Sequence, residues 1–596
     1  MRELILCGKP VSAFSILLSG TPQPAERTAA AFLQNVIRTS CGVTLPILPS
    51  GGANTIRIGT EPPASGVRWD GFRIRTDEAH VYLDGLIPRG TLFAAYGFAE
   101  RYLGYRKLSS DTEVFSAEGK AELPANTERI ENPTFEERRC DWVEFQKDPE
   151  LCAHSRLFSL GEPIPEELGA QPDSPWSCHS FYQFLPGKEY FESHPEYYSL
   201  HNGVRHSCDG GYGPGQLCLT HPDVLRIVTE NALKRLKANP GARTLELSQC
   251  DNENYCECDA CKAVDEAEGS HAGSLIRFVN AVAEAVEKEF PDVLVRTFAY
   301  MYSVKPPKLT RARHNVIIRY CTIHGCFRHA IDDPACEKNR ETMAREITGW
   351  GERCDRMCIW DYLTNWCSYL TPFPNLYALK ENVRVFDECH ALQVFEEDHP
   401  SCPGGGLYPE LRAYLVGLLL WNARLSDEEF ESEIDLFLKG YYGPGWRELR
   451  TVMQIEQAAT KDRCFSCNEE IDIGLCYYYS APKIPELPRY MRRNYRALAY
   501  QPILPNHALL PFCERMDEVQ ACFDRAEAAA ETDLQREHLH KSRVSVNYLK
   551  LFCMPHDRDS MSEEARKRYE AEVKAFFADK EKYGLHYNIQ TDVFGQ

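Results

Sequence analysis

The first part of the chain alternates short strands with amphipathic helices. Apolar residues at helical spacing predict helices over 25–40 and 92–103. Apolar and polar residues alternate with period two, which predicts half-buried strands, at 55–60, 71–76 and 80–85. We predict a β-hairpin over residues 1–20, because Lys9 and Pro10 interrupt the apolar runs that a signal peptide would need. This pattern predicts a small α/β sandwich domain over 1–130.

The pattern changes between residues 131 and 425 to short, mostly apolar strand candidates separated by long stretches compatible with helices. The eight candidates are 138–145, 179–185, 216–219, 244–250, 293–300, 316–321, 357–362 and 391–396. Strands that alternate with helices form a parallel sheet, and eight such units in about 290 residues is the rhythm of a TIM barrel. We therefore predict a (β/α)8 barrel over 131–425.

Helical patterns replace the strands after residue 425. Ser426 and Glu429 have the spacing of a capping box, and an amphipathic helix follows them. Further helices are predicted at 446–460, 510–530, 533–553 and 562–582. The chain therefore ends in a predicted α-helical domain over 426–596.

Composition narrows the classes of partner. The 596 residues include 67 Lys and Arg against 87 Asp and Glu, a formal net charge of −20. A field of that sign disfavours nucleic acid and anionic membranes, and no apolar stretch approaches the length of a membrane span. The 25 cysteines are too sparse for a disulfide scaffold, and without an export signal we expect reduced thiols in a cytoplasmic protein.

Carboxyl groups occur at several predicted strand ends, where TIM barrels place their active sites. Asp251 and Glu253 follow the fourth strand, and Asp361 lies in the seventh. The eighth strand ends near Glu396, which points inward if the Leu392 side of that strand faces the barrel interior. A lone acid at a strand end more often caps a helix or pairs with arginine, so the prediction depends on the clustering.

Two of these acids have the spacing that glycosidic bond cleavage requires. Neighbouring strands lie roughly 4.8 Å apart, so Asp361 and Glu396 at adjacent strand ends would lie within about 5 to 8 Å. One acid, with its pKa raised by burial and by the other charge, would protonate the leaving oxygen. The second would stabilise the positive charge that develops on the sugar.

Aromatic side chains crowd the same predicted strand ends. Flat rings stack on the apolar faces of sugars, although each ring alone is more often part of a core. His179, at the start of the second strand, could donate a hydrogen bond to a substrate hydroxyl or be a structural histidine. The aromatic residues at these ends are Trp142, Tyr182, Tyr300, Tyr302, Trp360 and Trp366.

A cysteine cluster lies just past the fourth strand. Cys256, Cys258 and Cys261 place three soft ligands in one turn, and Cys250 or a distant residue would complete a tetrahedral zinc site. Ordinary reduced thiols that pack as small hydrophobes are the open alternative. Such a zinc would be structural. A second group, which could supply the missing ligand or form its own site, comprises Cys321, His324, Cys326, His329 and Cys336.

Several motifs together resemble a known bacterial family. The pieces QLCLTHPDV, SQCDNENYCECDAC, IWDYLTNW and VFEED resemble the domain of unknown function 4838. Part of that group is classified as glycoside hydrolase family 163, whose known activity is endo-β-N-acetylglucosaminidase on complex N-glycans. The domain order also resembles the α-glucuronidase and β-hexosaminidase group. The likeness spans most of residues 1–425.

The resemblance implies a retaining, substrate-assisted hydrolysis in which the 2-acetamido oxygen of the sugar attacks its own anomeric carbon. On this reading Asp361 orients the amide and Glu396 donates the proton. In α-glucuronidases the acid comes from the end of strand four, here Asp251 or Glu253, and Glu410 is a further candidate.

The predicted partner is an oligosaccharide, and catalysis would need no cofactor. An α-glucuronidase would need a basic residue such as Arg205 or Arg319 to hold the uronate. A non-catalytic carbohydrate-binding barrel is the alternative from another class, because fold alone does not imply chemistry. The oligomeric state stays open, a homo-oligomer included.

Overall fold

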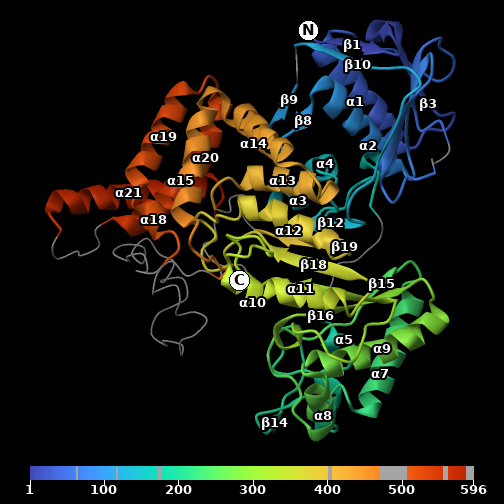
Figure 1. Cartoon of the computed structure of the whole chain (residues 1–596), viewed down its shortest axis with the longest axis vertical. Coiled ribbons are helices and arrows are strands. Elements are labelled where there is room, and N and C mark those ends of the chain that lie inside the picture. Colours follow the sequence, from blue (N-terminus) through green and yellow to red (C-terminus); the bar gives the residue numbers. More distant parts are fainter. Residues whose placement is uncertain are drawn as a thin grey trace.

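The computed structural model contains three regions that follow one another along the chain (Figure 1). An α/β region is followed by a central parallel sheet with its helices, and then by a group of helices. The structure describes residues 1–61, 65–115, 118–171, 178–399, 406–468, 507–554 and 561–585.

The N-terminal region is built on a six-stranded mixed sheet in the order β11-β6-β7-β5-β3-β4. Helices α1 (Pro24–Cys41) and α2 (Pro88–Phe98) pack together, and α2 packs on β6 and β7. The predicted strands and helices are confirmed, as is the hairpin of β1 (Glu3–Leu6) and β2 (Lys9–Pro10). The sheet strands are β3 (Ser15–Leu18), β4 (Ile47–Leu48), β5 (Thr55–Ile58), β6 (Phe72–Thr76), β7 (His80–Gly85) and β11 (Glu128–Glu131).

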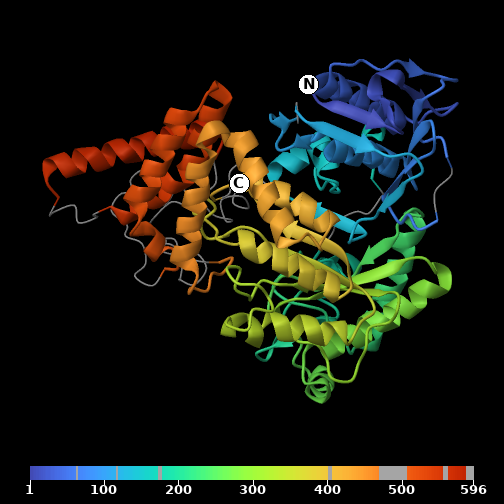
Figure 2. The same cartoon turned by 45° about the horizontal axis from the view of Figure 1, so that its top comes forward.

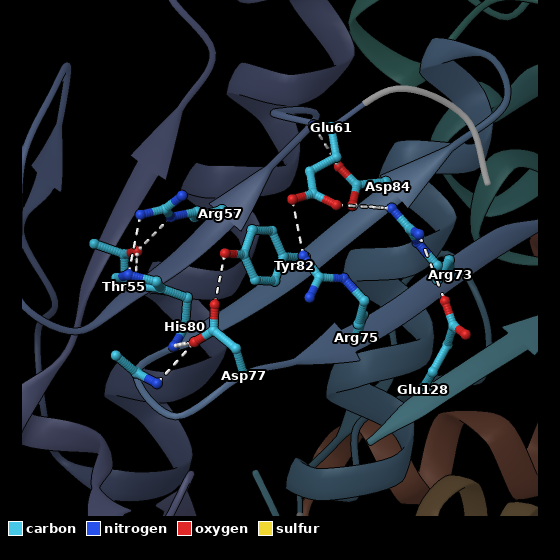
Figure 3. A network of polar contacts seen from close by, with 11 residues as sticks. Thr55, Arg57, Glu61, Arg73, Arg75, Asp77, His80, Tyr82, Asp84 and Glu128 are labelled. Carbon is cyan, nitrogen blue, oxygen red and sulfur yellow. Dashed lines mark hydrogen bonds and ion pairs between the residues drawn. The ribbon is translucent and has the colours of Figure 1, made fainter. Parts of the chain in front are cut away.

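One face of this sheet is covered by a network of paired charges (Figure 3). Arg73 contacts Glu61 at 3.1 Å, Asp84 at 3.5 Å and Glu128 at 3.5 Å. Arg75 also pairs with Glu61, at 2.8 Å. The alternating apolar residues of the same strands point to the other face, where they form a core with the helices. Period-two alternation thus places apolar packing on one face and charge pairing on the other.

The central region is a curled parallel sheet of six strands in the order β12-β19-β18-β17-β16-β15, with helices on its outer face. All six strands lie within predicted strands or within one residue of them. They are β12 (Glu137–Cys140), β15 (Thr244–Glu246), β16 (Leu294–Ala299), β17 (Val316–Cys321), β18 (Met357–Tyr362) and β19 (Ala391–Glu397). The helices that contact them include α9 (Ala272–Glu289), α12 (Leu376–Glu388) and α13 (Pro409–Trp421).

Two of the eight predicted strands are not strands, so the sheet is a half-barrel. Residues 179–185 contain the short helix α5 (Phe181–Phe184), because Phe181, Phe184 and Leu185 are buried at helical spacing. Residues 216–219 make only an isolated bridge between Leu217 and Tyr198. That segment lies between Gly215 and Pro222, which shorten any strand there.

Irregular segments lie along both edges of the half-barrel in place of further strands. Beside β15, the Phe181 amide donates to the Ser248 carbonyl at 3.0 Å and the Ser180 hydroxyl donates to the Glu246 carbonyl at 2.9 Å. Beside β12, the Phe158 amide donates to the Arg138 carbonyl at 2.8 Å. Backbone groups at the sheet edges are thereby satisfied without a closed barrel.

The C-terminal region is helical, as predicted. The capping box of Ser426 and Glu429 is present at the start of α14 (Asp427–Tyr442). The predicted helix over 510–530 is divided into α18 (Leu510–Cys513) and α19 (Met516–Ala529). The other helices are α15 (Trp446–Thr460), α20 (Asp533–Cys553) and α21 (Glu563–Lys582). No helix of the described residues is both long and apolar enough to cross a bilayer.

Helix α13 joins the three regions, with the N-terminal sheet on one side and the C-terminal helices on the other (Figure 2). At its end the Trp421 ring packs against Phe72 at 5.9 Å and Phe93 at 5.7 Å between centroids. Close by, the buried Asp70 accepts hydrogen bonds from Arg89 at 3.3 Å and from Arg138 at 2.5 Å. The N-terminal region is thus fixed to the central sheet by both apolar packing and a buried ion pair.

Candidate active site

The concave face of the half-barrel is identified by a polar layer that crosses it. Arg296 on β16 donates to the Gln393 side chain on β19 at 3.0 Å, although two strands lie between them. Only side chains on the concave face can meet across that gap. Because successive residues alternate between faces, Phe395 and Glu397 also point into the concavity. The Leu392 side of β19 faces outward, so Glu396 is not the inward acid.

Glu397 lies at the carboxyl end of β19 beside a row of rings that we call the aromatic wall: Phe395, Trp360, Phe298 and Tyr300. The Trp360 indole N–H on β18 donates to Glu397 Oε2 at 2.7 Å. The Trp360 ring lies 4.9 Å from Phe395 and 5.8 Å from Phe298, measured between centroids. Both Trp360 and Glu397 are partly exposed.

Asp251 lies on the opposite side of the same wall, after β15. The Tyr300 hydroxyl donates to Asp251 Oδ1 at 3.0 Å. The Phe298 ring connects the two sides, because it lies 5.6 Å from Tyr300 and 5.0 Å from His179. His179 Nδ1 contacts the Gln249 carbonyl at 2.9 Å, which fixes the ring. The predicted residues Asp251, His179, Tyr300 and Trp360 therefore meet in one place.

A third acid, Asp141, follows β12 and completes the group that we call the mouth carboxylates: Asp141, Asp251 and Glu397. The Asp398 amide donates to Asp141 Oδ1 at 2.6 Å. Burial and then the charge of Glu397 raise the pKa of Asp141. No lysine or arginine of the described residues forms an ion pair with a mouth carboxylate. Their negative charges therefore act on one another.

Glu397 is a mouth carboxylate whose pKa lies in the neutral range. Burial raises its pKa to about 8, the Trp360 hydrogen bond opposes that shift, and the charge of Asp251 adds to it. A carboxylic acid that keeps its proton at neutral pH can act as a proton donor. Environments that separate the protonation states of two nearby acids are typical of acid and base pairs in catalysis.

A cation lies beneath the aromatic wall. The Arg319 guanidinium is buried 5.3 Å from the Phe298 ring and 5.5 Å from the Trp360 ring, and it pairs with Glu246 at 3.3 Å. Arg205, the other basic residue considered for a uronate, instead contacts the Tyr198 carbonyl and Cys256. Of the two arginines, Arg319 is the one that packs against the aromatic wall.

The predicted pair Asp361 and Glu396 is brought together, but on the outer face. The two residues are paired in register on β18 and β19, and both are buried. Thr322 donates to Asp361 Oδ1 at 2.5 Å, and burial raises the pKa of Asp361 to about 6. Burial and the charges of Asp361 and Asp398 raise the pKa of Glu396 well above its ordinary value. Their catalytic roles stay predictions.

The remaining predicted residues do not join the mouth carboxylates in the concavity. Trp142 is 1% exposed and packs against Phe145 at 5.4 Å, so it belongs to the core. Glu253 is exposed on the loop after β15. Glu410 is buried against Lys541 of α20, with 2.6 Å between their charged atoms. Sequence reasoning missed Glu397 and Asp141 as inward acids.

The predicted cysteine cluster is present, and of the two alternatives for its fourth member the structure brings in a distant residue, Cys218, and not Cys250. The Sγ atoms of Cys218, Cys256, Cys258 and Cys261 all lie within 4.8 Å of one another. Cys218 Sγ lies 3.7 Å from Cys258 Sγ and 4.0 Å from Cys261 Sγ. These distances agree with the separation of about 3.8 Å between two thiolate sulfurs on tetrahedral zinc. Cys250 instead contacts Cys208, at 3.1 Å. Four thiolates in this arrangement fit a closed structural zinc site.

Comparisons with known proteins agree with the fold. A family model described as domain of unknown function (DUF4838) matches residues 107–448, more than half of the chain. No curated protein sequence matches. A structure described as a novel family GH115 4-O-methyl-α-glucuronidase with specificity for decorated arabinogalactans is 13% identical, with a TM-score of 0.54. The match covers 97% of this chain and 77% of that one, so the two share a fold.

Two other solved structures are more distant. A GH138 enzyme described as targeting pectin rhamnogalacturonan II is 10% identical, with a TM-score of 0.48 and coverage of 96% of this chain and 92% of that one. A mutant β-hexosaminidase from Streptomyces plicatus in complex with its product is 12% identical, with a TM-score of 0.37 and coverage of 71% and 89%.

Proposed function

The chain belongs to the DUF4838 family, and we propose that it is a glycoside hydrolase in which Glu397 and Asp251 are the catalytic carboxyl groups. The observation that supports this most is the grouping of Asp251 and Glu397 on the concave face of a half-barrel, where both are partly exposed and neither forms an ion pair with a described lysine or arginine. Acids in this position lower the stability of the fold, because burial disfavours their charge. A role in chemistry on a ligand accounts for their presence.

Glu397 is the proposed general acid. At neutral pH its carboxyl group is protonated, since burial and the charge of Asp251 raise its pKa to about 8. The Trp360 N–H binds Oε2 and leaves the other oxygen to deliver the proton to the glycosidic oxygen. Cleavage of the bond between that oxygen and the anomeric carbon then leaves Glu397 ionised, ready to act as a base towards water.

Asp251 is the proposed partner that stabilises the sugar. The Tyr300 hydroxyl fixes its orientation by donating to Oδ1 at 3.0 Å. In a β-N-acetylglucosaminide, Asp251 would accept the N–H of the 2-acetamido group while the acetamido oxygen bonds to the anomeric carbon. Water then attacks the anomeric carbon, and the bond between that carbon and the acetamido oxygen breaks. Glu397 accepts a proton from the water, which restores the protonated state that it had before it protonated the leaving group. The motif likeness to hexosaminide-cleaving enzymes supports this substrate.

An α-glucuronidase is the second candidate, and Arg319 favours it. The buried guanidinium lies next to the Trp360 ring, so it adds positive potential beneath the mouth carboxylates. That potential would favour a sugar with a carboxylate. For Arg319 to contact the carboxylate of such a sugar directly, part of its ion pair with Glu246 would have to break.

A substrate panel tests the proposal. Wild type is assayed on aryl β-N-acetylglucosaminides, aryl glycosides of neutral sugars and aldouronic acids, with released sugars identified by mass spectrometry. We expect N-acetylglucosamine release, whereas uronate release alone would establish the second candidate. No hydrolysis of any member would favour a binding protein.

Matched variants test the residue assignment. Asp251→Asn should abolish most turnover, and Asp361→Asn, its counterpart on the outer face, should change stability more than kcat. Loss of turnover in Asp361→Asn with activity retained in Asp251→Asn would reverse the assignment in favour of the outer pair. Melting temperatures of both variants separate unfolding from lost chemistry.

We also infer that the four-cysteine cluster holds a structural zinc. Its ligands lie in the segment before α7 (Pro222–Ala238), in the loop that follows Asp251 and in the first turn of α8 (Asp259–Glu268). The metal would fix that loop and, through it, one wall of the mouth. The Leu200 amide donates to Cys256 Sγ at 3.5 Å, which is the hydrogen bond that a metal-bound thiolate accepts. Zinc content of Cys218→Ser, compared with wild type, is the measurement.

A further inference from the structure

We propose that Cys326, His329, Cys336 and Cys464 form a second structural zinc site, which fastens the segment after α15 to the loop after β17. This site is separate from the four-cysteine cluster and from the mouth carboxylates. The proposal concerns the architecture of the chain and does not depend on the proposed reaction.

The spacing of the four side chains fits a tetrahedral metal. Their ligand atoms all lie within 4.8 Å of one another, and the Sγ atoms of Cys336 and Cys464 are 3.9 Å apart. Two thiolates bonded to zinc at about 2.3 Å lie about 3.8 Å apart. A disulfide would need about 2.05 Å. The arrangement therefore matches two ligands that share an ion.

His329 is oriented as a metal ligand. Its Nε2 lies 2.7 Å from the Lys461 carbonyl oxygen, which can only accept, so Nε2 holds the proton. The lone pair is then on Nδ1, which faces Cys326 Sγ at 3.3 Å. A ligating histidine that donates its other N–H to a backbone carbonyl is the usual arrangement around zinc.

The thiolates have the surroundings that negative charge requires. The Phe465 amide donates to Cys326 Sγ at 3.4 Å. Zinc with three thiolates and one imidazole has a net charge of about −1, because each thiolate contributes one negative charge to a divalent ion. The hollow beside the site is lined by Lys338 and Lys461 and by Glu337 and Asp462, so its charged side chains balance one another. The hydrogen bond from Phe465 is therefore the contact that stabilises a thiolate here.

The site has a route for the ion to enter. Cys326 and Cys336 are buried and His329 is partly exposed, whereas Cys464 is exposed. A hollow of about 590 Å³ lies in front of them, lined by His329, Cys336 and Cys464. A plausible metal site requires access as well as ligand geometry. The exposed Cys464 would bind last and close the site.

The ion would connect parts of the chain that are distant in sequence. Cys336 and Cys464 are 128 residues apart. The segment that contains Cys464 also pairs with two loops at the carboxyl ends of the strands: the Phe327 amide donates to the Phe465 carbonyl at 2.8 Å and the Trp366 amide to the Cys467 carbonyl at 2.7 Å. Closing so long a loop restricts the unfolded chain, which adds stability.

Zinc stoichiometry of the full chain tests the proposal. Wild type and variants are dialysed against metal-free buffer, and zinc per chain is measured by inductively coupled plasma mass spectrometry. We expect Cys464→Ser to contain one zinc fewer than wild type, and Cys389→Ser, which alters a cysteine outside both clusters, to contain the wild-type amount. Equal zinc in wild type and Cys464→Ser would overturn the proposal.

Zinc bound at the four-cysteine cluster can be distinguished from zinc bound at the second site. Cys218→Ser removes a ligand from the four-cysteine cluster alone, so the combination of Cys218→Ser and Cys464→Ser should contain no zinc. If the first cluster binds nothing, wild type contains one zinc, which Cys464→Ser removes and Cys218→Ser keeps. Each proposed zinc site is therefore tested by its own variant.

Ligand exchange at His329 provides a test that misfolding cannot imitate. His329→Cys should retain the metal, because a thiolate replaces the imidazole. After cobalt substitution, its visible spectrum should change from that of a three-sulfur, one-nitrogen site to that of a four-sulfur site. A cobalt spectrum identical in wild type and His329→Cys would contradict ligation by His329.

Discussion

The outer face of the N-terminal sheet and the mouth of the half-barrel both gather acidic side chains, yet they neutralise them differently. In the N-terminal network, Glu61, Asp84 and Glu128 all contact Arg73 (Figure 3). At the mouth, Asp251 and Glu397 accept hydrogen bonds from neutral groups, the hydroxyl of Tyr300 and the indole of Trp360. The first group is balanced by cations, whereas the second is held in place by neutral donors, with no ion pair to a lysine or arginine in the part of the chain that the structure describes.

This difference distinguishes structural acids from acids available for chemistry. Asp84 is buried beside Arg73, and its pKa still rises only to about 6. No lysine or arginine of the described residues forms an ion pair with Glu397, and the charge of Asp251 helps to raise its pKa to about 8. A paired acid keeps its charge and stabilises the sheet, whereas an unpaired one keeps a proton that it can give away.

The largest expected effect separates the two groups by activity. Glu397→Gln should lower kcat/KM by about 10³-fold, because an amide cannot donate the proton and general acid catalysis typically contributes about 10² to 10⁴. Glu61→Gln, the matched change in the N-terminal network, should leave kcat/KM within about twofold. Steady-state rates on the best substrate of the panel measure both. Comparable losses in the two variants would remove the distinction.

A smaller effect concerns stability and pH. A carboxyl group whose pKa is higher in the folded than in the unfolded chain destabilises the fold as the pH rises above about 4.3 and through the folded value. For Glu397 that window ends at about pH 8. Wild type should therefore lose stability between pH 5 and pH 8.5, and Glu397→Gln should lose less.

Urea unfolding at those two pH values measures the difference. Glu61→Gln is the control, and it should follow the wild-type dependence on pH. A Glu397→Gln protein that loses as much stability as wild type over this range would show that Glu397 is not protonated in the folded chain at pH 5 to 8.

The smallest effect concerns the paired network. Arg73→Met removes the cation shared by Glu61, Asp84 and Glu128 and should lower the free energy of unfolding by about 1 to 3 kcal/mol, mainly because Asp84 is buried. Activity should not change, since the network is separate from the mouth. Unfolding and rate measurements on the same preparation test this, and a parallel loss of kcat would contradict it.

Sequence patterning predicted the elements whose signal is local. The helices over 446–460 and 533–553 and the strands of the N-terminal sheet follow from residues that are neighbours in the chain. The failures at 179–185 and 216–219 came from short apolar runs, which period alone cannot assign. Whether a parallel sheet closes depends on contacts between distant segments, and no local pattern contains that information.

The candidate site was predicted in its location and only partly in its members. Both faces of β19 are buried, so the apolar Leu392 and Val394 gave no reliable sign of which face is concave. The polar Gln393, in phase with Glu397, was the available signal, since a polar residue in a buried strand needs partners across the concavity. Cys218 was missed because it lies far from Cys256 in sequence and within a predicted strand.

The packing of Trp421 against Phe72 and Phe93 limits where this protein can be truncated. Asp70, from the first region, compensates the buried guanidinium of Arg138 in the central sheet. A truncated chain that began at the half-barrel would therefore expose an indole ring and leave a buried cation without its counter-charge. The N-terminal region therefore supports the folding of the parallel sheet, and a shortened protein that keeps this sheet must keep both regions.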